Sequence, residues 1–322
     1  MRRLKENWFL LSLLAVCALT LGDPGGAVAG AGKWLKVHYG PNAVICLIFL
    51  FSGMVLRRQE IRSGIGDVKG TTVTLVVIFV AGPAAALLLN LLPLDPGLTI
   101  GLILVGVMPT TLTSGVVMTG AAGGNIAHAL LITILANGLS VFTVPLSLAF
   151  LLGLGEGIGA VPIDRAGMTL QIGLLVLMPL FLGMALRPGR EASQALLGRA
   201  VPIVNQCLVL AILWMAFSEA KSTVLGGGLD MVSVLTLSFL YHALLLLVAF
   251  GSARVFSLGA GRRESVIFMG GQKTLPLSVL IQVTLFPSYG LALAFCVVHH
   301  LIHLMMDGYL VGLLRRKGGV ME

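Results

Sequence analysis

Residues 105–115 read VGVMPTTLTSG, and residues 268–278 read FMGGQKTLPLS. Both belong to long apolar runs that glycine, proline and hydroxyl residues interrupt. An interruption in a membrane-buried helix frees main-chain amides and carbonyls, which are tolerated in a bilayer only where they line a cavity within the protein. Paired interruptions in the two halves of a chain indicate the binding site of a secondary transporter. The sequence therefore favours transport.

The composition places the chain in a membrane. It has 322 residues, of which 57% are hydrophobic and 11% charged, and its mean hydropathy is +1.01. Because a soluble domain carries roughly a quarter charged residues, we expect a single membrane-embedded unit surrounded by the lipid bilayer. The net charge of +8 could indicate nucleic acid, but the basic residues cluster in short loops between apolar runs. We expect no nucleic-acid partner.

Ten apolar runs approach the length of about 20 residues that a membrane helix needs. With the N-terminus inside, sixteen Lys and Arg residues fall in inner segments and four in outer loops, which is a strong bias under the positive-inside rule. Both termini are therefore predicted to be cytoplasmic. The compact loops favour the inner membrane of a bacterial cell, and an organelle membrane is the alternative. Alternatively, residues 1–29 are a cleaved secretory signal. The predicted spans are 7–22, 41–56, 71–92, 97–119, 125–153, 168–186, 201–218, 231–254, 264–286 and 290–314.

Ten spans divide into two halves of five, residues 1–160 and residues 161–322. An odd number of spans in each half makes the second half enter the membrane from the opposite side, which produces an inverted repeat. The interruptions fall in the fourth and ninth spans, the fourth member of each half. The predicted fold is an all-α membrane protein in which two broken helices cross at the midplane. The oligomeric state stays open.

Hydroxyl and amide side chains gather at and after the first interruption. Their oxygens are hard ligands that suit a small cation or a hydrogen bond to a substrate. The simpler alternatives are that they bond to their own helix or hold membrane helices together. We predict substrate or ion binding by six of them: Thr110, Thr111, Thr113, Ser114, Asn125 and Thr133.

The second interruption carries Gln272, Lys273 and Thr274, which we assign to the same site. A lysine near the bilayer centre costs about 2.5–3.5 kcal/mol on insertion scales and needs a partner. Lys273 lies roughly 13 Å beyond Glu264 at 1.5 Å per residue, which is too deep for easy snorkelling. We predict a role for Lys273 in coupling; the alternative is a structural tether across the break.

The tenth span adds a polar stripe. His299, His303 and Asp307 are spaced i, i+4 and i+8, so they share one helix face. They suit a proton relay or a metal site, and a contact between Lys273 and Asp307 through His303 is geometrically open. The alternative is that they bond to carbonyls of neighbouring helices. We predict His303 and Asp307 to be coupling residues, and we interpret His242, which is isolated in its span, as a packing residue.

No catalytic triad, zinc-binding motif or phosphate-binding glycine loop occurs in the chain. We therefore expect neither an enzyme nor a resident cofactor or metal. The coupling ion is expected to be sodium or a proton.

These motifs together resemble the bile acid:sodium symporter superfamily, and within it the SBF-like branch. The resemblance covers essentially the whole chain. It implies ten helices in two inverted repeats, a panel domain, a core domain, and a site where helices four and nine cross. Its most specific parts are Met108-Pro109, Ser114-Gly115-Val-Val, Gly124-Asn125, Gly271-Gln272-Lys273-Thr274-Leu and Val298-His299-His300.

The better-known bile acid branch binds two sodium ions near that crossing, and this chain departs from its pattern. Phe268 stands where that branch has an acidic residue, and Lys273 stands where it has Asn. Ala129 and Ile78 replace a serine and a glutamine, while Thr133 matches a sodium-binding threonine. A dehydrated cation needs its ligands and charge replaced, so we expect degraded sodium sites, with the Lys273 ammonium in one vacated cation position.

The preferred function is secondary active transport of an organic anion, bile-acid-like or otherwise amphipathic, coupled to a cation by alternating access. The N-termini of the half-helices would favour the anion by their dipoles. Two alternatives stay open. One is a divalent-metal or proton-coupled ion transporter that uses the polar stripe of the tenth span, and the other is a non-transporting membrane regulator or scaffold.

Overall fold

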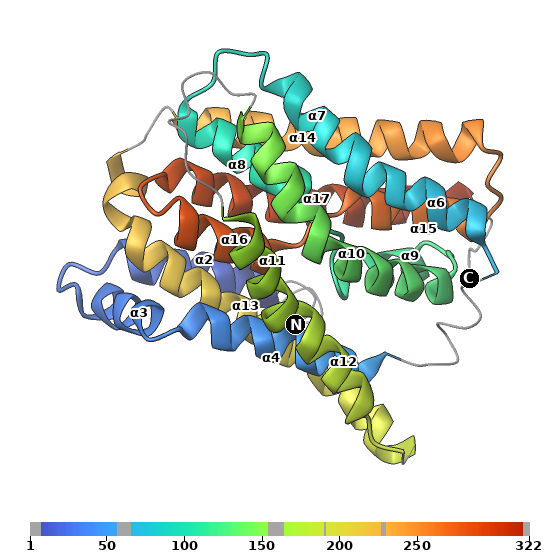
Figure 1. The fold of residues 1–322 in the computed structure, drawn as a ribbon, viewed down its shortest axis with the longest axis horizontal. Coiled ribbons are helices and arrows are strands. Elements are labelled where there is room, and N and C mark those ends of the chain that lie inside the picture. Colours follow the sequence, from blue (N-terminus) through green and yellow to red (C-terminus); the bar gives the residue numbers. More distant parts are fainter. Residues whose placement is uncertain (1–7, 57–65, 154–163, 190, 227–229, 318–322) are drawn as a thin grey trace.

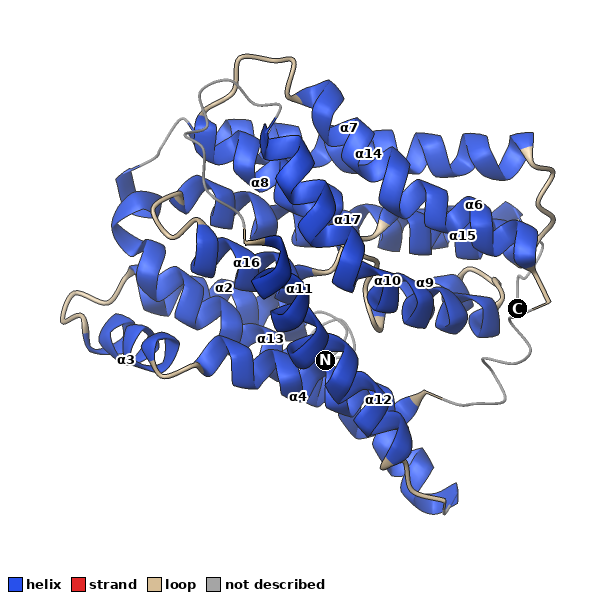
Figure 2. Ribbon diagram, viewed as in Figure 1, coloured by secondary structure: helices blue, strands red, loops and turns tan. Residues whose placement is uncertain are grey.

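The structure is a computed structural model that describes residues 8–56, 66–153, 164–189, 191–226 and 230–317. Within these ranges every regular element is a helix (Figure 2). The all-α prediction is confirmed for this part of the chain. Some residues of the predicted charge pattern lie outside the described ranges, namely Arg2, Arg3, Lys5, Arg57, Arg58, Arg62 and Arg190.

Every predicted span coincides with a helix or a pair of helices, and two π-helical turns (η1, η2) occur within spans. The first half contains α2 (Trp8–Leu21), α3 (Ala27–Val37), α4 (Gly40–Val55), α6 (Val68–Val76), η1 (Val77–Ala81), α7 (Gly82–Leu89), α8 (Pro96–Val107), α9 (Ser114–Ala121) and α10 (Ile126–Gly153). The second half contains α11 (Arg165–Ile172), η2 (Gly173–Leu177), α12 (Met178–Ala185), α13 (Glu191–Gly226), α14 (Asp230–Val255), α15 (Arg262–Gly271), α16 (Leu275–Leu285) and α17 (Gly290–Lys317).

Several of these helices are long and apolar enough to cross a membrane. Among the described residues there are seven, and an eighth if α3 and α4, which meet at 73°, form one span. The predicted count of ten requires two shorter pieces as well, α2 and the interrupted pair α8–α9. The protein is thus a multi-pass membrane protein whose first and fourth predicted spans are the least regular.

Helix α3 was not predicted, because it is short and mixed in polarity. Its backbone lies against α13: the Trp214 indole donates a hydrogen bond to the Val28 carbonyl at 3.2 Å. A Cβ added at Gly32 would lie 2.1 Å from the Ser218 hydroxyl oxygen. The helix therefore forms through close packing on a neighbour, which a hydropathy pattern does not reveal.

The helices form two groups (Figure 1). In one group α13 packs against α2, α3 and α4, and α12 packs against α4. In the other, α14 packs against α15 and α17, α17 against α8, and α15 against α6 and α9. Both interruptions belong to the second group. The first group supplies the opposite wall of the site described below.

Proline and glycine account for both breaks. Pro109 has no amide hydrogen and cannot continue α8, so the backbone turns extended at Met108 (φ −67°, ψ 147°). The second break begins after Gly271, where Gln272 is also extended (φ −77°, ψ 145°). Helix α16 then restarts with Pro276 in its first turn, a position that suits proline.

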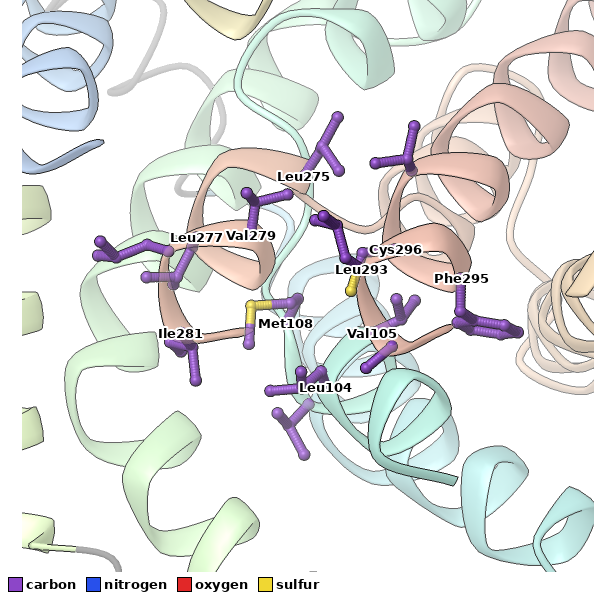
Figure 3. Packing of buried hydrophobic residues seen from close by; sticks show 14 of the residues in the cluster. Leu104, Val105, Met108, Leu275, Leu277, Val279, Ile281, Leu293, Phe295 and Cys296 are labelled. Atoms are coloured by element: carbon purple, nitrogen blue, oxygen red, sulfur yellow. The ribbon is translucent and has the colours of Figure 1, made fainter. Parts of the chain in front are cut away.

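The broken segments form the centre of the hydrophobic core. Leu104, Val105 and Met108 at the end of α8 face α16 and α17 in Figure 3. The hydrophobic stretch of α15–α16 is 100% buried within the protein, the largest share among the candidate spans of the described chain. The interrupted helices are therefore enclosed by other helices, which is the condition under which irregular backbone is tolerated in a membrane.

Candidate functional site

The two interruptions lie against one another, as predicted. The amide of Thr274 donates to the Pro109 carbonyl at 2.9 Å. The hydroxyls of Thr111 and Ser114 both donate to Oε1 of Gln272 at 2.7 Å. One glutamine therefore joins the first break to the second through two side-chain bonds, and a main-chain bond adds a third connection.

Lys273 is buried, and its ammonium is held by main-chain oxygens. Nζ donates to the carbonyls of Ile78 at 2.7 Å, Met108 at 3.0 Å and Gly106 at 3.1 Å. These carbonyls come from η1 and from the end of α8. Lys273 thus connects three chain segments, which fits the tether interpretation of this residue.

Asp307 is fully buried on α17 and bonds to side chains. Its Oδ1 lies 2.9 Å from Nε2 of His242, and its Oδ2 accepts a bond from Nε2 of Gln272 at 2.7 Å. The predicted contact between Lys273 and Asp307 is wrong, because the ion pair found for Asp307 in the described chain is with His242. The packing interpretation of His242 agrees with this bond, because the bond joins α14 to α17.

Four histidines form a cluster that includes His242, the partner of this carboxylate. The ring centroids of His242, His299 and His303 lie 5.5–5.8 Å from one another, and Nε2 of His303 lies 2.8 Å from Nδ1 of His300. The predicted stripe on α17 is therefore a real cluster facing α14. No group of three His, Cys, Asp or Glu side chains in the described ranges is arranged to hold a metal ion.

A cavity of about 110 Å³ opens at the breaks. Thr113 and Ser114 at the start of α9 border it, as do Thr274 and Leu275 at the start of α16. Neither Thr113 nor Thr274 caps its helix with its side chain. Two helix N-termini with available hydroxyls therefore meet in one pocket. The remaining walls are Phe9, Ile48, Thr111, Leu112, Asn205, Gln206, Val209, Pro276, His300 and Leu304.

A wider pocket of about 600 Å³ adjoins this cavity and shares Thr113 and Ser114 with it. Met118 on α9, Pro202 on α13 and Gly308 on α17 line the wider part. The two pockets together form a cleft between the two groups of helices. Its inner end reaches the breaks.

Three of the predicted site residues do not line the cavity. Thr110 is buried at the break, and its hydroxyl has no hydrogen-bond partner among the residues that the structure describes. Thr133 bonds to its own helix at the Ala129 carbonyl (3.0 Å). Asn125 is exposed and accepts a bond from the His128 amide at 3.1 Å at the start of α10. Neither Thr133 nor Asn125 borders the cavity, so the structure favours local bonding for both.

Known proteins identify the family of this chain. The profile of the SBF-like CPA transporter family (DUF4137) matches residues 7–316. The chain belongs to this family. SBF-like members are transmembrane transporters related to the bile acid:sodium symporters, and the resemblance drawn from the two breaks is confirmed.

Several SBF-like relatives align over most of their length. The chain is 29% identical to the probable sodium/metabolite cotransporter BASS4 of Arabidopsis thaliana, over 97% of this chain and 73% of that protein. It is 25% identical to sodium/bile acid cotransporter 7 of Xenopus tropicalis, over 90% and 85% of the two chains. It is also 25% identical to the putative symporter YfeH of Escherichia coli, over 86% and 84%.

Proposed function

We propose that the protein is a secondary active transporter that moves an organic anion by cation-coupled alternating access. The proposal includes ten membrane spans arranged as two inverted repeats, residues 1–160 and 161–322, with both termini cytoplasmic in a bacterial inner membrane. Two observations support it: each break falls in the fourth span of its half, and hydrogen bonds join the two breaks. The names of the relatives, which describe sodium-coupled cotransporters, agree with it.

Two helix N-termini meet in one cavity, and this observation is the reason for proposing an anion as the substrate. Each N-terminus presents the positive end of a helix dipole and first-turn amides that point away from the helix body, and such helix ends attract negative charge. The hydroxyls of Thr113 and Thr274 add donors at the same place. Apolar walls from Phe9, Leu275 and other residues fit the rest of an amphipathic molecule.

The cleft between the two helix groups supports alternating access. Met118, Pro202 and Gly308, which line its wide part, lie toward the predicted cytoplasmic ends of their helices. The present conformation would therefore face the cytoplasm. Rocking of one helix group against the other would close this side and open the other.

Asp307 is our candidate for the coupling proton site, with His303 as its neighbour. Among the described residues this buried carboxylate is paired with a histidine and has no lysine or arginine partner, and ionisable side chains inside membrane spans are typical of proton pathways. Gln272 bonds both to Asp307 and to the hydroxyls at the cavity. A change at the carboxylate would thus alter groups that face the anion.

Uptake into proteoliposomes tests this function. Radiolabelled taurocholate serves as an amphipathic anion, with an imposed proton gradient, sodium gradient or neither. We expect uptake above that of empty liposomes, driven by the proton gradient and reduced in the double variant Thr113→Val/Ser114→Ala. The organic-anion proposal fails if taurocholate and a panel of smaller carboxylates neither accumulate nor raise the unfolding temperature of the protein, because a bound ligand must stabilise the folded state.

A further inference from the structure

Three carbonyl oxygens surround the ammonium of Lys273 and form what we call the carbonyl cradle: Ile78 O, Gly106 O and Met108 O. Their distances to Nζ lie between 2.7 and 3.1 Å. Only 2% of the Lys273 surface is exposed. Asp307, the carboxylate at the same break, bonds instead to His242 and Gln272. The ammonium is therefore balanced by main-chain dipoles.

Each carbonyl of the cradle is available for a local reason. In η1 the Gly82 amide bonds to the Val77 carbonyl instead of the Ile78 carbonyl. The next residue is Pro83, which has no amide hydrogen, so the Ile78 oxygen has no donor from its own helix at either position. Gly106 and Met108 lie at the end of α8, where Pro109 ends the helical bonding.

The space around the cradle is closely fitted. A Cβ added at Gly82 would lie 2.5 Å from Nζ and 2.9 Å from the Gly106 oxygen. Both distances are shorter than carbon makes to nitrogen or oxygen without a bond. Glycine at position 82 thus leaves room for one small cationic group among three oxygens.

We propose that the carbonyl cradle is a binding site for a small monovalent cation, which the chain fills with its own ammonium. Carbonyls freed by broken helices coordinate sodium in transporters, and carbonyl rings replace the water of potassium in channels. A tethered ammonium supplies the charge of such an ion but cannot be released. It follows, if the protein transports as proposed, that the coupling cation binds elsewhere.

Removal of the tether tests the proposal without any transport. Purified full-length protein in detergent is titrated with sodium chloride, potassium chloride or methylammonium chloride against choline chloride at constant ionic strength, and the unfolding temperature is read from tryptophan fluorescence. In Lys273→Ala we expect a saturable rise of about 2–5 °C with at least one of the three cations. In the wild type the cradle is filled, so the cations should add no such rise through it.

Lys221→Ala is the matched control, because Lys221 also donates to a carbonyl, that of Asp23, but near the surface. It should respond to the cations like the wild type. If Lys273→Ala is unstable in choline, recovery in methylammonium supports the cradle. Failure in every cation, or a folded variant without cation-specific stabilisation, overturns it. Taurocholate uptake is measured separately, so loss of the transport proposal would leave this result interpretable.

Discussion

Lys273 and Asp307 are both buried at the second break, yet they are satisfied in opposite ways. The ammonium lies among three main-chain carbonyls whose positions are set by a π-helical turn and a helix end. The carboxylate bonds to an imidazole and a side-chain amide, two groups that can rotate. A charge held by backbone is fixed, whereas a charge held by side chains is adjustable. The difference supports the proposal that Lys273 is structural and that Asp307 is the coupling residue.

Replacing the fixed charge should have the largest effect. Lys273→Met keeps much of the side-chain volume but leaves three buried carbonyls without a donor. We expect a loss of about 3–5 kcal/mol of unfolding free energy, measured by denaturation in detergent with choline as the cation. Lys221→Met should change stability by about 0.5 kcal/mol or less. A loss below about 1 kcal/mol for Lys273→Met would remove the contrast with Asp307.

Replacing the adjustable charge should affect transport more than folding. Asp307→Asn keeps an oxygen for Gln272 but cannot gain or lose a proton. We expect proton-driven uptake to fall about 100-fold, equivalent to about 2.7 kcal/mol, while the unfolding temperature changes little. Asp230→Asn, at the exposed start of α14, is the control. Full proton-driven uptake by Asp307→Asn would exclude the coupling role.

Crowding the carbonyl cradle should have an intermediate effect. Gly82→Ala places a methyl group against the Lys273 ammonium, and such overpacking costs about 1–3 kcal/mol. At Gly251 on α14 no atom of the described chain lies within 4 Å of an added Cβ, so Gly251→Ala should be neutral. Equal stability of the two variants in thermal unfolding would show that the ammonium can move aside, and the cradle would then not be rigid.

The two hydroxyls that donate to Gln272, those of Thr111 and Ser114, should contribute unequally to stability. Thr111 donates to Gln272 and also accepts a bond from the Gly115 amide at 2.9 Å, whereas Ser114 makes only the bond to Gln272 among those found. At about 1 kcal/mol per bond, Thr111→Val should cost about twice as much unfolding free energy as Ser114→Ala. The reverse order would indicate that the breaks are not held together through Thr111.

The smallest effect is expected at Asn125, which caps α10. Asn125→Ala should cost about 0.5–1 kcal/mol and leave the apparent affinity for taurocholate unchanged in the uptake assay. Asn125→Ser, which retains capping, should recover the stability. A loss of uptake in Asn125→Ala at normal stability would instead return this residue to the binding site.

The sequence was sufficient to place the breaks, the α17 stripe and the family, because proline, glycine and buried charge are strong local signals. Gln272 joined Thr111 and Ser114 as expected from paired breaks. The partner of Asp307 was not predictable, since His242 lies 65 residues away on a helix whose orientation depends on packing. The bond from Lys273 to the Ile78 carbonyl was not predictable either. A π-helical turn frees a backbone oxygen, and the residue types in the turn do not reveal it. Helix α3 was missed because it is short and mixed in polarity and depends on close packing against α13.

The enclosure of α15–α16 has a consequence for how the protein is made. Among the candidate spans of the described chain this stretch is the least apolar, and its apolar part is fully buried among other helices. Insertion of a segment with Gln272 and Lys273 into lipid alone would be unfavourable. The carbonyls that accept bonds from the ammonium lie in η1 and at the end of α8, and both are synthesised before α15–α16. Biogenesis should therefore proceed by late entry of this segment into a preassembled helical scaffold, and truncations that remove its acceptors should leave it outside the bilayer.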